Sequence, residues 1–312
     1  MTIFPTKILL ATDGSREAEL AAKTAIRVAQ ETGSELHVIH VLILPPQSAH
    51  DPYSFNTEAR EQAEKRSRAR LEELVGRIET SGGKVGGSHL GVGRPDAEII
   101  DRAEEIGAGL IIVGSRGLGT IRRSLTGSVS DSVVHYAHCP VLVARGEAVE
   151  LPTKILVAID GSEEAVLAAS TAADLAKGTG SELHVVYVEP LTYAHQLAGW
   201  ETYNVDLLNR LDEAAEEEAS SRLEEQVQKI TETGGEIAGA HARVGYPDAE
   251  IVGLAGRLDA GLIVMGSRGL GPLRRALMGS VSDSVVRHAH CPVLVVRPEN
   301  ERSAESRADH ST

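Results

Sequence analysis

The chain contains the same segment twice, and this duplication restricts its architecture more than any other feature. Residues 114–145 and 266–297 are identical at 25 of 32 positions. Near the start of each copy, TKILLATDGS at 6–15 matches TKILVAIDGS at 153–162. A repeat of this length has the size of a domain, whereas solenoid repeats are about 20–50 residues long. The sequence therefore predicts two similar domains in tandem.

The copies differ in length at one place. GSELHVIHV from Gly33 matches GSELHVVYV from Gly180, an offset of 147, whereas the later segments match at an offset of 152. Copy two therefore has five more residues between these regions. We expect the first domain at residues 1–147, the second at 152–298, and a polar, disordered tail at 299–312.

Within each copy, short apolar runs alternate with helical patterns. In copy one the runs are Ile8–Thr12, Leu36–Leu42, Val85–Val92, Leu110–Val113 and Val141–Ala144, and the helical patterns are Glu17–Ala29, Glu58–Ile78, Asp96–Ile106 and a segment from Ser128. This alternation predicts an α/β fold with a parallel sheet and right-handed crossovers. Because the runs are apolar throughout, helices are expected on both faces of the sheet.

Composition excludes one class of partner. The formal net charge is -14, whereas a protein that binds duplex nucleic acid needs a positive surface to displace counterions. An aromatic content of 3% leaves few rings on which single-stranded bases could stack. We therefore expect no nucleic-acid partner.

No apolar run approaches the roughly 20 residues of a membrane-spanning helix, and the first residues lack the pattern of a secretory leader. We expect a cytoplasmic protein without a membrane segment. Cys139 and Cys291 occupy equivalent positions, each after a histidine. Because adjacent residues in a strand point to opposite faces, we interpret these pairs as packing residues and assign no metal site.

A glycine-rich loop follows the fourth apolar run of each copy. Its pattern is Gly-x2-Gly-x9-Gly-Ser, formed by Gly114, Gly117, Gly127 and Ser128 in copy one and by Gly266, Gly269, Gly279 and Ser280 in copy two. Glycine lets backbone N–H groups approach phosphate oxygens, and the N-terminus of the following helix attracts anions. The alternative is a simple turn between strand and helix; we favour phosphate binding because ligands of such sheets bind at the carboxyl ends of the strands.

With these motifs the chain resembles the universal stress protein family in its tandem, ATP-binding form, over almost all of residues 5–298. The resemblance implies a five-stranded sheet in the order 3-2-1-4-5 in each domain. It also implies that each last strand pairs with that of another domain, which would make the chain an intramolecular pseudo-dimer that could form homodimers. ATP, or ADP or AMP, is the implied ligand, with Mg²⁺ accompanying the triphosphate.

The resemblance also implies roles for single residues. Asp13 and Asp160 would lie beside the adenine and ribose, Val41 and Val188 would offer backbone contacts to the adenine edge, and Val113 and Met265 would pack on the base. Arg116 and Arg268 could reach a phosphate, and Val129 and Val281 follow the serines at the helix start. Simpler explanations exist for several: aspartate is a good helix N-cap, and the apolar side chains suit a core.

The loops contain no lysine and no P-loop motif, and we can place no Ser-His-Asp triad. We therefore expect a nucleotide-dependent regulatory protein of the stress response, with slow or no hydrolysis and an unknown protein partner. An ATP-using enzyme and a nucleotide-independent interaction module remain alternatives. The stretches Leu44–Asn56 and Glu189–Asn204, which follow the second strand, differ strongly between the copies and predict unequal nucleotide affinities.

Overall fold

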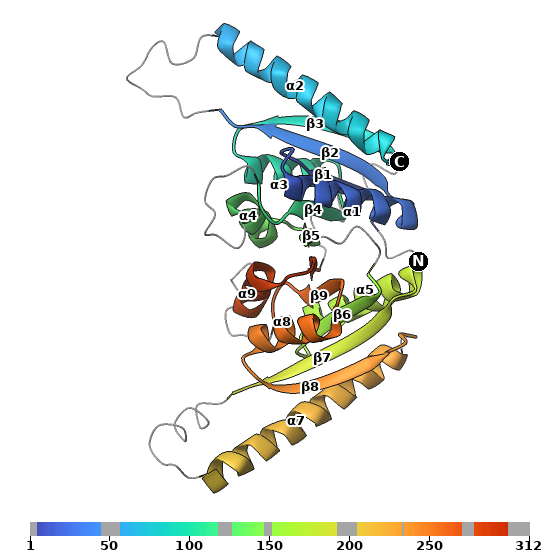
Figure 1. Cartoon of the computed structure of the whole chain (residues 1–312), viewed down its shortest axis with the longest axis vertical. Helices are drawn as coiled ribbons and strands as arrows, with labels where there is room; N and C mark the ends of the chain where they lie inside the picture. The colour runs from blue at the N-terminus through green and yellow to red at the C-terminus, as the bar shows by residue number, and fades with distance from the viewer. Residues whose placement is uncertain are drawn as a thin grey trace, which may run out of the picture. The chain divides into compact units, whose positions relative to one another are not determined.

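The computed structural model describes residues 5–44, 57–117, 127–146, 152–191, 205–232, 234–269 and 278–298. The chain forms two compact units, one within residues 1–149 and the other within 150–298. Each unit alternates strands and helices along the chain (Figure 1).

Unit one contains five strands and four helices among its described residues. The strands are β1 (Lys7–Ala11), β2 (Glu35–Leu42), β3 (Val85–Val92), β4 (Leu110–Gly114) and β5 (Val141–Ala144). The helices are α1 (Arg16–Thr32), α2 (Thr57–Thr80), α3 (Pro95–Glu105) and α4 (Ser128–Tyr136).

Unit two repeats this order. Its strands are β6 (Lys154–Ile159), β7 (Glu182–Pro190), β8 (Gly239–Gly245), β9 (Leu262–Gly266) and β10 (Val293–Val296). Its described helices are α5 (Glu163–Thr179), α7 (Val205–Glu232), α8 (Pro247–Leu258) and α9 (Ser280–His288).

All strand pairs within a unit are parallel, and the order is 3-2-1-4-5 in both. In unit one Ile8 is paired with Leu36 of β2 and Leu110 of β4, and in unit two Ile155 is paired with Leu183 and Leu262. Right-handed crossovers then place α1 and α2 on one face of the first sheet and α3 and α4 on the other. The contacts of α1 with α2, and of α3 with α4, agree with this arrangement. The predicted doubly wound α/β fold is confirmed.

The helix boundaries follow from local chemistry. Ser15 begins α1 by accepting a hydrogen bond from the Ala18 N–H at 3.2 Å, and Ser162 does the same for α5 through Ala165. Gly33 ends α1 in a left-handed conformation with φ of 68°, which glycine adopts without strain. The sequence therefore encodes both ends of this helix.

The core consists of aliphatic side chains from the central strands and the helix faces that cover them. Ile8, Leu9 and Leu10 of β1 and Ile155, Leu156 and Val157 of β6 are fully buried. The long charged helices α2 and α7 bury only a few residues each, so they are solvated on most of their surface as expected. Among the described residues, no helix combines the length and apolar character needed to cross a membrane.

Candidate functional site

The residues singled out from the sequence lie at the carboxyl ends of the central strands. Asp13 follows β1, and Gly114 is the last residue of β4, which is paired with β1. Gly127 and Ser128 begin α4, after the Gly-rich loop. In unit two, Asp160 follows β6, Gly266 ends β9, and Gly279 precedes α9. The topology therefore brings one loop, one aspartate and one helix start to the same edge of each sheet.

Backbone hydrogen bonds hold the two ends of the loop together. The Gly127 N–H donates to the carbonyl of Ser115 at 2.8 Å, and the Ser115 N–H donates to the carbonyl of Ala144 in β5 at 2.9 Å. The hydroxyl of Ser130 adds a bond to the Ser115 carbonyl at 3.2 Å. Ser267 and Gly279 make the equivalent bond in unit two at 2.8 Å. The base of each loop is thus fixed to the sheet.

The helix that follows the loop starts without a side-chain cap. Gly127 and Gly279 occupy the N-cap positions of α4 and α9, and neither offers an acceptor to the first N–H groups. Ser128 and Ser280 are the first helical residues and are exposed. The first N–H groups of a helix have no partner within it, so the amides of this turn can accept an anion.

The second loop glycine lies against the aspartate that follows the first strand. A Cβ added at Gly117 would lie 2.4 Å from Asp13 Oδ2, and one at Gly269 would lie 2.1 Å from Asp160 Oδ2. Asp13 Oδ1 accepts a hydrogen bond from the Ser15 N–H at 2.9 Å, which fixes the carboxylate beside the loop. Asp13 and Asp160 are thus part of the loop's surroundings, although Ser15 and Ser162 are the helix N-caps.

Close approach also explains the first loop glycine. A Cβ at Gly114 would lie 2.8 Å from the backbone carbon of Glu17, in the first turn of α1. In unit two a Cβ at Gly266 would lie 2.8 Å from Cβ of Glu164. The start of the loop therefore passes directly over the start of α1 or α5, and a larger residue would push the two apart.

Val41 and Val188 lie in the second strand of each unit, paired with Gly91 of β3 and Arg243 of β8. Val113 and Met265 are only 3% and 4% exposed, so core packing accounts for both, and contact with a base stays a prediction. Val129 and Val281 are half-buried in the first turns of α4 and α9.

The loop arginines differ between the units. Arg116 is exposed and forms no ion pair with any described residue, whereas Arg268 Nε lies 3.4 Å from Glu164 Oε1. The further arginines of the loops, Arg122, Arg123, Arg274 and Arg275, lie outside the described residues. So do Pro45, Pro46, Tyr193, Trp200 and Tyr203 of the divergent stretches and the tail at 299–312.

Sequence reasoning missed two residues that complete the first site. Arg70 of α2 donates from Nη2 to the Asp13 carbonyl at 3.1 Å, and Ser15 Oγ donates to the Arg116 carbonyl at 3.4 Å. Arg70 aligns with Arg222 at the offset of 152 residues, so comparison of the copies could have identified it.

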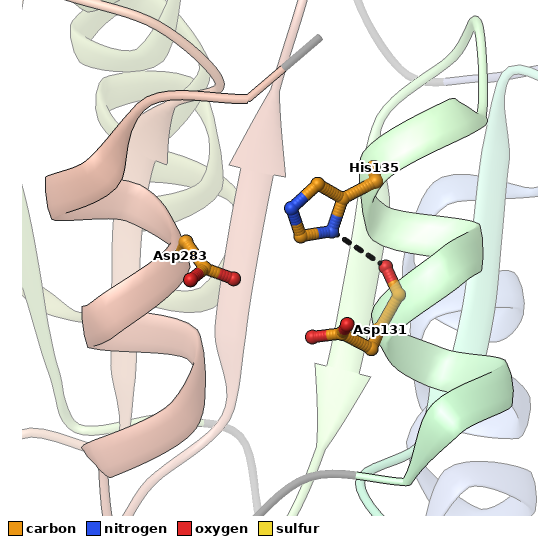
Figure 2. Close-up of side chains that lie close together, drawn as sticks. All are labelled: Asp131, His135 and Asp283. Carbon is orange, nitrogen blue, oxygen red and sulfur yellow. Dashed lines mark hydrogen bonds between the residues drawn. The ribbon is translucent and has the colours of Figure 1, made fainter. Parts of the chain in front are cut away.

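In the histidine-cysteine pairs, His138 is half-buried and His290 is exposed, and a packing role for the pairs stays a prediction. Cys139 and Cys291 are both buried. In α4, His135 Nδ1 lies 2.8 Å from the backbone carbonyl of Asp131 (Figure 2). Asp283 of α9 is the residue equivalent to Asp131.

Comparison with other proteins agrees with this geometry. The model of the universal stress protein family matches residues 5–145 and again 152–297. A universal stress protein of Mycobacterium tuberculosis is 30% identical over 302 residues, which cover 93% of this chain and 96% of the relative. One of Mycolicibacterium smegmatis is 28% identical over 299 residues, with coverage of 93% and 97%. The crystal structure of a universal stress protein from Archaeoglobus fulgidus is 26% identical, covers 95% of this chain and 97% of its own, and has a TM-score of 0.68. The chain belongs to the universal stress protein family.

Proposed function

We propose that each of the two domains binds an adenine nucleotide at the carboxyl edge of its sheet, and that the bound nucleotide regulates the protein's choice of partner in a stress response. The domains would occupy residues 1–147 and 152–298. ATP is the expected ligand, with ADP and AMP as related ligands.

The uncapped start of α4 and of α9 carries this proposal. Helices α1 and α5 begin with a serine whose side chain accepts a backbone N–H, whereas α4 and α9 begin with glycine and have no such acceptor. Helices α3 and α8 also start without a side-chain cap, so the position of α4 and α9 directly after the Gly-rich loop is the feature that distinguishes them. Serine, threonine, asparagine or aspartate at that position stabilises a helix by about 1 kcal/mol relative to alanine, and by roughly a few tenths of a kcal/mol relative to glycine. Two helix starts that forgo this stabilisation beside a Gly-rich loop suit a phosphate group, which supplies the missing acceptors.

The remaining residues fit a nucleoside. Asp13 and Asp160 can accept hydrogen bonds from ribose hydroxyls or an amino group, and Val41 and Val188 offer backbone groups near the ends of their strands. The nucleotide would supply the negative charge that the helix N-terminus attracts. A divalent cation such as Mg²⁺ would accompany a triphosphate.

We propose slow hydrolysis or none. The loops contain no lysine and no P-loop motif, and the Ser15 N–H holds Asp13 Oδ1 in a fixed position beside the loop. An ATP-using enzyme would instead show steady turnover that Asp13→Ala with Asp160→Ala abolishes. A nucleotide-independent interaction module would bind its partner equally well after the loops are blocked.

Thermal unfolding with and without nucleotide tests the proposal. A ligand that binds only the folded state at about 100 times its dissociation constant stabilises that state by roughly 2.7 kcal/mol. We expect ATP to raise the melting temperature of the natural chain and to leave that of the Gly127→Asp, Gly279→Asp double variant unchanged.

This double variant is suited to the test because it keeps the fold. Gly127 and Gly279 have φ near -75° and ψ near 150°, which any residue adopts, and aspartate is a good N-cap. The new carboxylate would occupy the helix N–H groups and repel phosphate. Gly127→Ser with Gly279→Ser adds a neutral cap and is the matched control for charge. An equal response of the natural chain and the aspartate variant to ATP would contradict the proposal.

A further inference from the structure

We infer that the two sites select nucleotides by charge, with the site of the first domain selective for a polyphosphate and the site of the second accepting a monophosphate comparably well. The inference rests on the proposed function and concerns the difference between the two sites. It follows from three places where equivalent residues have different partners or opposite charges.

The first difference is in the loop. Arg268 is paired with Glu164 at 3.4 Å, and the Glu164 side chain is only 17% exposed, so this ion pair is partly shielded from water. The equivalent Arg116 is exposed and forms no ion pair with a residue that the structure describes. Arg116 can therefore offer its positive charge to an additional phosphate, whereas Glu164 offsets part of the positive charge that Arg268 presents there.

The second difference is in the long helix that covers each site. Arg70 of α2 donates to the carbonyl of Asp13, and its Nη2 would lie 2.6 Å from a Cβ at Gly14. The equivalent Arg222 of α7 donates instead to Glu218 Oε1 at 2.6 Å. This hydrogen bond to Glu218 raises the pKa of Arg222. At the first site the positive charge of Arg70 faces a neutral carbonyl, whereas at the second site the carboxylate of Glu218 neutralises the charge of Arg222.

The third difference is the charge of the whole covering segment. Residues 60–70 of α2 contain five basic and two acidic side chains, a net charge of +3. The equivalent residues 212–222 of α7 contain five acidic and one basic side chain, a net charge of -4. Arg66 and Glu218 are equivalent and lie one turn before Arg70 and Arg222, so they share a face with these arginines.

The second strand extends this contrast. In unit two the hydroxyl of Tyr187 donates to Glu189 Oε2 at 2.9 Å, beside Val188. In unit one the equivalent residues are His40, whose Nδ1 lies 2.9 Å from the Thr12 carbonyl, and the uncharged Leu42. The second domain therefore has one more carboxylate near the proposed adenine position.

These charges act most strongly on the ligand with the most charge. ATP carries more negative charge than AMP, and fields of this kind extend over about 8 Å at physiological ionic strength. The first domain attracts the additional phosphates of ATP, whereas the acidic segment of the second domain repels them. The ratio of AMP to ATP dissociation constants should therefore be larger at the first site.

Calorimetry on single-site variants tests this. Gly279→Asp leaves only the first site and Gly127→Asp leaves only the second. We expect ATP to bind about tenfold more tightly than AMP at the first site, and the ratio at the second site to be within about threefold of one, each tenfold corresponding to about 1.4 kcal/mol. Added salt should reduce the ratio at the first site.

Charge reversals outside the loops isolate the cause. Arg66→Glu should lower the ATP preference of the first site, and Glu218→Arg should raise that of the second. Lys84→Glu is the matched control, because this exposed lysine precedes β3 at the opposite edge of the sheet, and it should change neither ratio. Circular dichroism establishes that each variant is folded.

The outcomes separate the two claims. If the ratio of AMP to ATP dissociation constants were equal at the two sites, or if the charge reversals did not change it, this inference would be overturned and the proposed function would remain intact. Absence of binding by the natural chain and by every variant would overturn both.

Discussion

At the scale of single residues, the contact between Gly117 and Asp13 is a tight constraint on the first site, and Gly269 and Asp160 repeat it in the second. A Cβ at Gly117 would lie 2.4 Å from Asp13 Oδ2, well inside van der Waals contact, and the carboxylate is also bonded to the Ser15 N–H. Only glycine lets the loop and the aspartate occupy these positions together.

We therefore predict that Gly117→Ala displaces the Asp13 carboxylate and weakens nucleotide binding at the first site by about tenfold or more, roughly 1.4 kcal/mol. The measurement is a titration in the Gly279→Asp background. Gly76→Ala is the matched control: no atom lies within 4 Å of its Cβ, and it sits inside α2. It should leave binding unchanged and stabilise the fold by roughly 0.5–1 kcal/mol. Unchanged binding in Gly117→Ala would contradict the role of this contact.

The sequence predicted the loop residues and Asp13 because their types and spacing carry the signal. Comparison of the copies could have drawn attention to Arg70, but the contacts that Arg70 and Glu164 make could not be predicted, because they depend on which loop each helix reaches. The geometry also changed one interpretation: the N-cap of α1 is Ser15, and Asp13 is left to face the loop.

At the scale of elements, each unit contains a histidine pair between its second and third strands. His37 Nδ1 lies 3.0 Å from His89 Nε2, and the planes of the two rings are nearly parallel, with an angle of 9° between them. His184 and His241 repeat the contact at 3.2 Å. A Cβ at Gly87 or Gly239 would lie 2.5 Å from the facing ring, so each pair occupies a space that glycine provides.

These pairs predict a loss of stability in acid. Burial lowers the pKa of His37, His89 and His241 below the ordinary value of 6.5. The unfolded chain therefore takes up protons at a higher pH than the folded chain. The stabilisation is complete above about pH 6.5 and is lost as pH falls from there through the lowered pKa values.

We expect the urea midpoint of unfolding to fall between about pH 7 and pH 5, and the fall to be smaller in His89→Gln with His241→Gln. If the variant lost stability with falling pH as steeply as the natural chain, the histidine pairs would be excluded as the cause of that loss.

The alternation of strands and helices was predictable from periodicity. The histidine pairs were not, because they depend on the register between β2 and β3.

At the scale of the whole molecule, duplication has produced two domains with the same fold and the same loop but different surroundings. The loop was predictable because both copies preserve its spacing, and the strand order was implied by the resemblance to the universal stress protein family. The opposite net charges of residues 60–70 and 212–222 can also be counted in the sequence. Their relevance to the site became apparent only from the hydrogen bond between Arg70 and the Asp13 carbonyl. Pairing of the last strands of the copies, and of chains with one another, stays a prediction.

The unequal surroundings predict unequal affinities in the natural chain. A single titration with ATP should show two binding events with different dissociation constants, and Glu218→Arg should bring them closer. Two identical and independent constants would contradict this expectation.

The most direct test of nucleotide binding is isothermal titration calorimetry of the natural chain, freed of bound nucleotide, with ATP. We predict two ATP molecules bound per chain, one after either Gly127→Asp or Gly279→Asp, and none after both. Absence of measurable ATP or AMP binding by the natural chain would contradict the account.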